Sequence, residues 1–94
     1  MLNKPAKRRY LSVMHKGLAN EAINAIMKRC SDLFGSVATE KAEIRLVRSE
    51  NNVTIIKCIL EQLDNVLVAI ALSDPPAVTL DMSGTIKRLR RRLA

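Results

Sequence analysis

The stretch Val53 to Leu72, VTIIKCILEQLDNVLVAIAL, decides the fold of this chain. Residues 53–60 are rich in β-branched residues and apolar at odd and even positions alike, which is typical of a central strand covered on both faces. The following residues predict a helix from Asp64 to about Leu72, with Asp64 as its N-cap. The residues of that helix expected to face inward are Leu67, Ile70 and Ala71.

Working outward, the pattern predicts a strand from Arg9 to Lys16, a helix from Ala19 to Phe34 and a strand over residues 41–48. Turns are expected at Gly17, at Gly35 (which would end the helix in a left-handed conformation), at Asn51-Asn52 and at Asp74-Pro75-Pro76. A last strand, residues 77–82, leads through Ser83-Gly84-Thr85 into a terminal helix. The order β-α-β-β-α-β predicts an α+β, ferredoxin-like sandwich of the RRM-like type, with a four-stranded antiparallel sheet and an extra C-terminal basic helix.

Residues 1–94 are expected to form one single domain, with a basic N-terminal arm (1–8) and the basic helix at 84–94. The helices should cover one face of the sheet. On the other face, Val53, Ile55 and Ile59 share a side with Lys57 and form a candidate apolar interface.

Charge is strongly segregated. The chain has sixteen Lys and Arg against nine Asp and Glu, a formal net charge of +7. Residues 1–16 and 84–94 each contain five basic residues and no acid. Localised positive charge of this kind points to a polyanionic partner.

An active site in this chain is not indicated, and we expect neither catalytic residues nor a bound cofactor. The one histidine, His15, lies in a predicted strand, where a structural role is more common than a catalytic one. The three glycines are scattered singly, which rules out a glycine-rich phosphate loop. Cys30 and Cys58 could in principle share a zinc ion with His15, but both lie in apolar stretches that favour buried packing, so no metal site is expected.

RNA can be bound by such a fold in two ways. The RNA-recognition motif stacks bases on aromatic residues of its central strands, but the stretch VTIIKCIL has none, and Tyr10 and Phe34 are the only aromatics. Binding through backbone phosphates and RNA shape is therefore expected. The arginine fork suits phosphate because it donates two hydrogen bonds at once. The candidate RNA-binding residues are Lys7, Arg8, Arg9, Ser83, Gly84, Thr85, Lys87, Arg88, Arg90, Arg91 and Arg92.

Three stretches carry a family resemblance. The ending DMSGTIKRLRRRLA (residues 81–94) resembles the closing motif of the ribonuclease P protein component 2 family, the small archaeal and eukaryotic subunit of ribonuclease P. KRRYLSV (residues 7–13) is similar to the first strand of that family, and IIKCILEQLDNVLVAIAL (residues 55–72) to its third strand and second helix. The Ser-Gly-Thr-Ile sequence with a basic helix is the most specific of these elements.

The resemblance implies a non-catalytic subunit of an endoribonuclease that removes the 5′ leader of precursor tRNA. In that assembly the RNA performs the hydrolysis with Mg²⁺. The implied partners are ribonuclease P RNA, precursor tRNA and protein component 3, with a homodimer contact inside a heterotetramer. A cytoplasmic location and an archaeal source are expected.

Two alternatives stay open. A ribosomal or other architectural RNA-binding protein would have the same charge distribution. A membrane-surface helix is also conceivable for TIKRLRRRL, but its apolar face has only Ile86, Leu89 and Leu93, so no membrane partner is expected.

Overall fold

The computed structural model describes residues 7–87 and 89, and its elements follow the predicted order with one additional helix. They are β1 (Arg8–His15), α1 (Ala19–Phe34), α2 (Ser36–Ala42), β2 (Arg45–Glu50), β3 (Val53–Ile59), the 3-10 turn η1 (Leu60–Gln62), α3 (Leu63–Ala71) and β4 (Ala77–Ser83).

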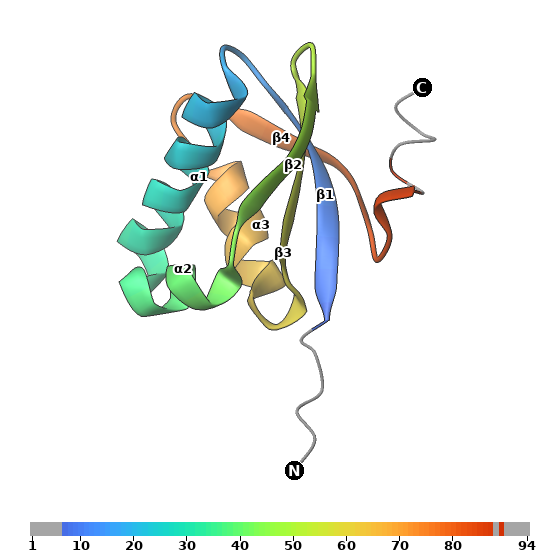
Figure 1. Cartoon of the computed structure of the whole chain (residues 1–94). Coiled ribbons are helices and arrows are strands. Elements are labelled where there is room, and N and C mark those ends of the chain that lie inside the picture. The colour runs from blue at the N-terminus through green and yellow to red at the C-terminus, as the bar shows by residue number, and fades with distance from the viewer. Residues whose placement is uncertain (1–6, 88, 90–94) are drawn as a thin grey trace.

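The strands form one antiparallel sheet in the order β2-β3-β1-β4, and α1 and α3 lie on the same face of it (Figure 1). This confirms the predicted α+β, ferredoxin-like class. β1 begins one residue earlier than expected, so Arg8 belongs to the sheet and not to the arm.

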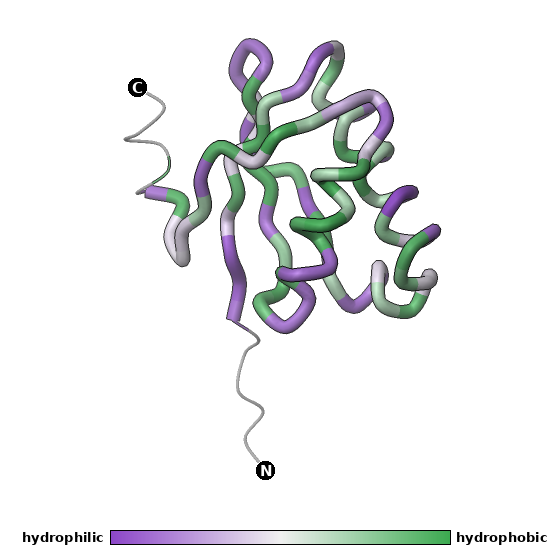
Figure 2. The backbone as a smooth tube through the Cα atoms, turned by 180° about the vertical axis from the view of Figure 1, so that it is seen from behind, coloured by the Kyte–Doolittle hydropathy of each residue, from purple (hydrophilic) through white to green (hydrophobic). Residues whose placement is uncertain are grey.

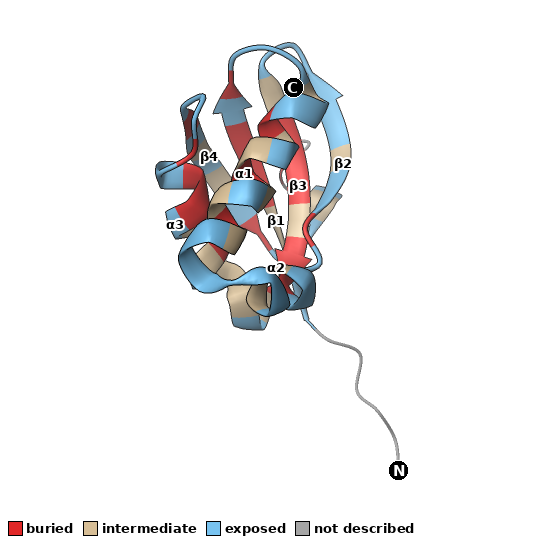
Figure 3. Cartoon of the chain, turned by 90° about the vertical axis from the view of Figure 1, so that its left-hand side faces the viewer, coloured by how far each residue is buried: buried red, intermediate tan, exposed pale blue. Residues whose placement is uncertain are grey.

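The core lies between the sheet and the helices. Leu11 and Val13 of β1 and Ile56 of β3 project from the sheet and are at most 1% exposed. Figure 3 shows the contrast between β3, which is mostly buried, and the edge strand β2, which is mostly exposed. Burying one such aliphatic side chain stabilises the fold by roughly 1.5–3 kcal/mol. The helix residues of this core include Ile26, Cys30, Val66, Ala69 and Ile70.

The helix α2 was not predicted, and it corrects the strand expected over residues 41–48. Gly35 ends α1 with φ 92° and ψ 162°, so its φ is positive but its conformation is not left-handed helical. The chain then re-enters a helix, in which the Thr39 hydroxyl donates to the Gly35 carbonyl (3.0 Å) and Ala42 is fully buried. The alternation of polar and apolar residues suggested an earlier start for β2. The strand begins only at Arg45, because Glu43 has a left-handed conformation (φ 47°) that a strand cannot include.

The start of α3 also differs from the prediction. Its N-cap position is Gln62, with no side-chain cap, because η1 carries the chain directly into the helix at Leu63. Asp64 therefore lies inside the first turn, and the N-cap assignment was wrong. Ala71 is exposed, whereas Ile70 is buried as expected and Leu67 packs against the core. Asn51 takes the predicted positive φ (54°) in the turn before β3.

The terminal helix is described only at its beginning. Ile86, Lys87 and Leu89 have helical backbone, and the remaining candidate residues Arg88, Arg90, Arg91 and Arg92 lie outside the described part of the chain. The expected arm is described only at Lys7, since residues 1–6 also lie outside it.

Candidate nucleic-acid interface

The start of β1 presents three consecutive basic residues. The carbonyl of Lys7 accepts a hydrogen bond from the Leu60 amide (2.8 Å), which fastens the entry of the strand to the end of β3. Arg8 is exposed, while Arg9 is partly buried and donates from Nη1 to the Arg8 carbonyl (3.0 Å). The cations are therefore held on an ordered strand from the first residue of the sheet onward.

The Ser83-Gly84-Thr85 turn meets this basic strand. Ser83 pairs with Tyr10 across β4 and β1, and a Cβ placed on Gly84 would lie 3.5 Å from Arg9 Nη1. The Thr85 amide donates to Ser83 Oγ (3.2 Å), which fixes the turn. Figure 2 shows hydrophilic residues near both ends of the described chain. The basic start of β1 and the turn that leads into the C-terminal basic segment, about seventy residues apart in sequence, thus lie side by side.

A row of four residues crosses the sheet beside this junction. Register places Arg45 opposite Lys57, Lys57 opposite Tyr10, and Tyr10 opposite Ser83. Because side chains alternate between the faces of a sheet, the row lies on the face away from α1 and α3. Arg45 and Lys57 were missed by sequence reasoning. The available signal was Lys57, a single cation in the otherwise apolar and neutral stretch VTIIKCIL.

The C-terminal turn closes the same sheet face. Leu89 is 0% exposed, and Ser12 and Ile55, which project from this face of β1 and β3, are 2% and 1% exposed. Figure 1 places the turn on the opposite side of the sheet from the helices. We conclude from this burial and from the place of the turn that Leu89 packs on this face. The expected exposed apolar face at Ile55 and Ile59 is therefore wrong, since both are buried.

The residues considered for chemistry are part of the core. His15 is buried, its Nε2 shares a hydrogen bond with the Thr54 hydroxyl, and its Nδ1 has no hydrogen-bond partner. Cys30 and Cys58 are free and buried, as predicted. Burial, with a smaller contribution from the neighbouring Cys30, raises the pKa of the Cys58 thiol to about 11. A thiol with that pKa stays protonated at neutral pH and is a poor nucleophile. The described residues include no group of three or more His, Cys, Asp and Glu arranged to hold a metal ion.

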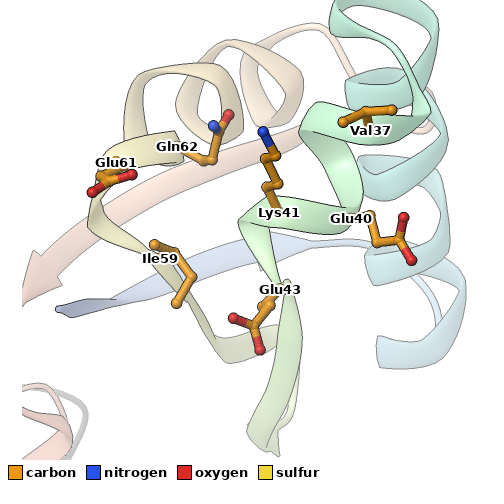
Figure 4. Close-up of a pocket in the computed structure, with 7 residues that line it drawn as sticks. All are labelled: Val37, Glu40, Lys41, Glu43, Ile59, Glu61 and Gln62. Carbon is orange, nitrogen blue, oxygen red and sulfur yellow. The ribbon is translucent and has the colours of Figure 1, made fainter. Parts of the chain in front are cut away.

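A second surface, between α2 and η1, has the opposite charge. It is an open hollow of about 510 Å³ with Ile59 in its lining (Figure 4). Glu40, Glu43 and Glu61 line it against one cation, Lys41. Its net negative charge would repel a phosphate backbone. The remaining lining residues are Val37 and Gln62.

The fold and this basic surface define a ferredoxin-like domain whose sheet face is occupied by its own C-terminal turn. No protein-family model matches the sequence, and no curated protein matches it. Among solved structures, a chain in the cryo-EM structure of yeast ribonuclease MRP has a TM-score of 0.63 to this protein. The match covers 98% of this chain and 95% of that chain at 10% sequence identity, and it shows a shared fold over nearly the whole length. No helix within residues 7–87 and 89 is both long and apolar enough to cross a membrane.

Proposed function

We propose that this protein is a non-catalytic, RNA-binding subunit of ribonuclease P, the ribonucleoprotein that removes the 5′ leader of precursor tRNA. The observation that carries the proposal is the proximity of Arg9 to the Ser83-Gly84-Thr85 turn, from which the C-terminal basic segment continues. The resemblance of the sequence to protein component 2 of ribonuclease P supports it. The shared fold with a chain of yeast ribonuclease MRP, a relative of ribonuclease P, is consistent with it.

The geometry favours binding to phosphates over reading of bases. Leu89 occupies the sheet face on which an RNA-recognition motif would stack bases, and Tyr10 is the one aromatic residue of the four strands. The cations Arg45 and Lys57 lie on that closed face, and Arg9 lies at its border beside Gly84, so that together they can follow the backbone of a folded RNA. Each contact to a phosphate releases condensed counterions, which makes affinity steeply dependent on salt.

The proposed role is to stabilise the catalytic fold of the RNA. Phosphate contacts lower the repulsion between RNA segments, so the RNA would need less Mg²⁺ to fold and to hydrolyse its substrate. The Mg²⁺ would belong to the RNA and not to this protein. Protein component 3 is the proposed protein partner, with two copies of each chain in the assembly.

The test is to tag the protein, isolate it from its native cells at moderate salt, and sequence the bound RNA. Enrichment of ribonuclease P RNA, followed by reconstituted cleavage of precursor tRNA at lower Mg²⁺ than the RNA needs alone, is the expected result. Enrichment of ribosomal RNA would favour an architectural role in the ribosome instead. Recovery of no RNA would contradict RNA binding altogether.

A further inference from the structure

The two edges of the sheet have different surfaces. β2 exposes Arg45, Arg48 and Glu50, and Arg48 Nη2 forms an ion pair with Glu50 Oε1 at 2.6 Å. β4 has no lysine or arginine along Ala77–Ser83 and exposes Val78, Leu80 and Met82 by about half of their surface (52%, 49% and 48%). The one charged residue of β4 is Asp81, whose Oδ1 accepts a hydrogen bond from the Met82 amide (2.8 Å). The β2 edge therefore exposes mainly charged side chains, and the β4 edge mainly aliphatic ones.

An edge of the second kind is a template for another strand. Edge strands in soluble proteins are usually shortened, charged or covered, because their outward N–H and C=O groups pair readily with an added chain. β4 is seven residues long and is the last strand in the sheet order. Beside it packs α3, where Val68 and Leu72 are exposed four residues apart, on one side of the helix. The helix that packs against β4 therefore exposes two further aliphatic side chains.

The bend in β4 limits which segments can pair with it as an added strand. The register against β1 shifts between Ser12 and Val13, so that Leu80 has no partner residue and the strand bends there. A second copy of this chain would bring the same fixed bend, and two copies with a net charge of +7 each would repel one another. A flexible extended segment can follow the bend. Because the protein as a whole is positively charged, a basic segment is disfavoured.

We propose that the outer edge of β4 binds an extended segment of a partner protein as a fifth strand of the sheet. The segment has aliphatic side chains at alternate positions and a neutral or negative net charge. Main-chain hydrogen bonds to β4 supply affinity, and contacts with Val78, Leu80 and the exposed residues of α3 supply specificity. The site is centred on Leu80, whereas the proposed RNA surface reaches β4 only at Ser83.

The experiment is site-specific photo-crosslinking of the full chain in its native cells. A photoreactive amino acid replaces Leu80 in one variant and Leu46, an exposed aliphatic residue of the β2 edge (41%), in the control. The expected product at position 80 is one polypeptide segment of another protein, which peptide mass spectrometry identifies as extended, alternating in aliphatic residues and not basic. Crosslinks to RNA, to a second copy distinguished by isotope labelling, or to no polypeptide would overturn the proposal, as would the same product at position 46.

Two further measurements bear on the fifth strand itself. The identified segment is synthesised as a peptide and titrated against the free protein, and hydrogen exchange of the β4 amides should slow at least tenfold while exchange in β2 is unchanged. In an added strand, only every second amide of the peptide points toward β4. Methylating the even-numbered or the odd-numbered amide nitrogens should therefore abolish the protection for one of the two peptides only. Equal effects of the two methylated peptides would exclude strand pairing. The variant Leu80→Asn should weaken binding of the peptide and keep the affinity for RNA within twofold of the wild-type value. Peptide binding without RNA binding would reject the proposed function and keep the fifth strand.

Discussion

The two faces of the sheet are built from the same strands, but one face is apolar and the other carries basic side chains. On β3, Ile56 and Cys58 face α1 and α3 and are buried in the apolar core, whereas Lys57 between them faces the C-terminal turn and is part of a basic row. On β1, Leu11 enters the core while Tyr10 stands beside Lys57. The comparison teaches that a shift of one residue along a strand separates the apolar core from the basic surface in this domain. Predictions that act on one face alone test this separation.

The largest effect is expected from Leu89, which joins the terminal helix to the basic face. Leu89→Ala should lower the free energy of unfolding by about 2–4 kcal/mol, because a fully buried leucine is replaced by a cavity. RNA affinity should fall at least tenfold although no charge changes, because the proposed binding surface includes the C-terminal turn that Leu89 anchors. Chemical denaturation and RNA titration measure the two effects. As a control, Leu72→Ala replaces an exposed leucine and should change the free energy of unfolding and the RNA affinity only slightly. Equal losses of stability and affinity in the two variants would contradict docking of Leu89.

The next effect concerns the terminal arginines. The triple variant Arg88→Ala, Arg90→Ala and Arg91→Ala should weaken RNA binding by roughly two orders of magnitude and reduce the slope of log affinity against log salt by about 2–3. Unfolding should be nearly unchanged. The measurement is RNA affinity over a series of salt concentrations. A slope equal to that of the wild type would show that these three residues do not contact phosphates.

The core face should respond to pH instead of salt. Burial raises the pKa of Cys58 to about 11, above the value of a thiol in the unfolded chain. The unfolded state therefore releases its proton first, and the stabilisation that is fully present below about pH 8.5 is lost progressively as the pH rises toward 11, by roughly 2–3 kcal/mol. Denaturation midpoints between pH 8 and 11 measure this loss. Cys58→Ala, although less stable at pH 7, should lose less on going to alkaline pH; an identical pH profile would assign the effect to other groups.

Sequence reasoning found the strands and the main helices because their patterns are local. The alternation of β1 and the apolar stretch of β3 are visible in the residues themselves, and the turn at Asn51 needs only its own tolerance of positive φ. α2 was missed because Glu43 and Arg45 imitate the alternation of a strand. A left-handed residue between a helix and a strand leaves no such pattern.

The candidate site was predicted only in part for a physical reason. The basic ends are evident from charge counts. The proximity of Arg9 to Gly84, however, depends on the pairing of β4 with β1, a contact between distant parts of the chain. Arg45 and Lys57 join the site through sheet register, which depends on the bulge at Val47. Whether Lys7, Arg8, Arg9 or the terminal arginines touch RNA stays a prediction.

The smallest effect, and the sharpest test of the separation, is at Lys57. Lys57→Ala removes one cation from the centre of the basic row, so RNA affinity should fall about three- to tenfold and the salt slope by roughly 1, while stability stays within about 0.5 kcal/mol. Lys41→Ala removes the same charge from the acidic hollow between α2 and η1 and should leave RNA affinity unchanged. Net charge is identical in the two variants, so a difference between them reports position. Equal losses would mean that RNA senses only the overall charge of the protein, and the basic row would then not be a binding surface.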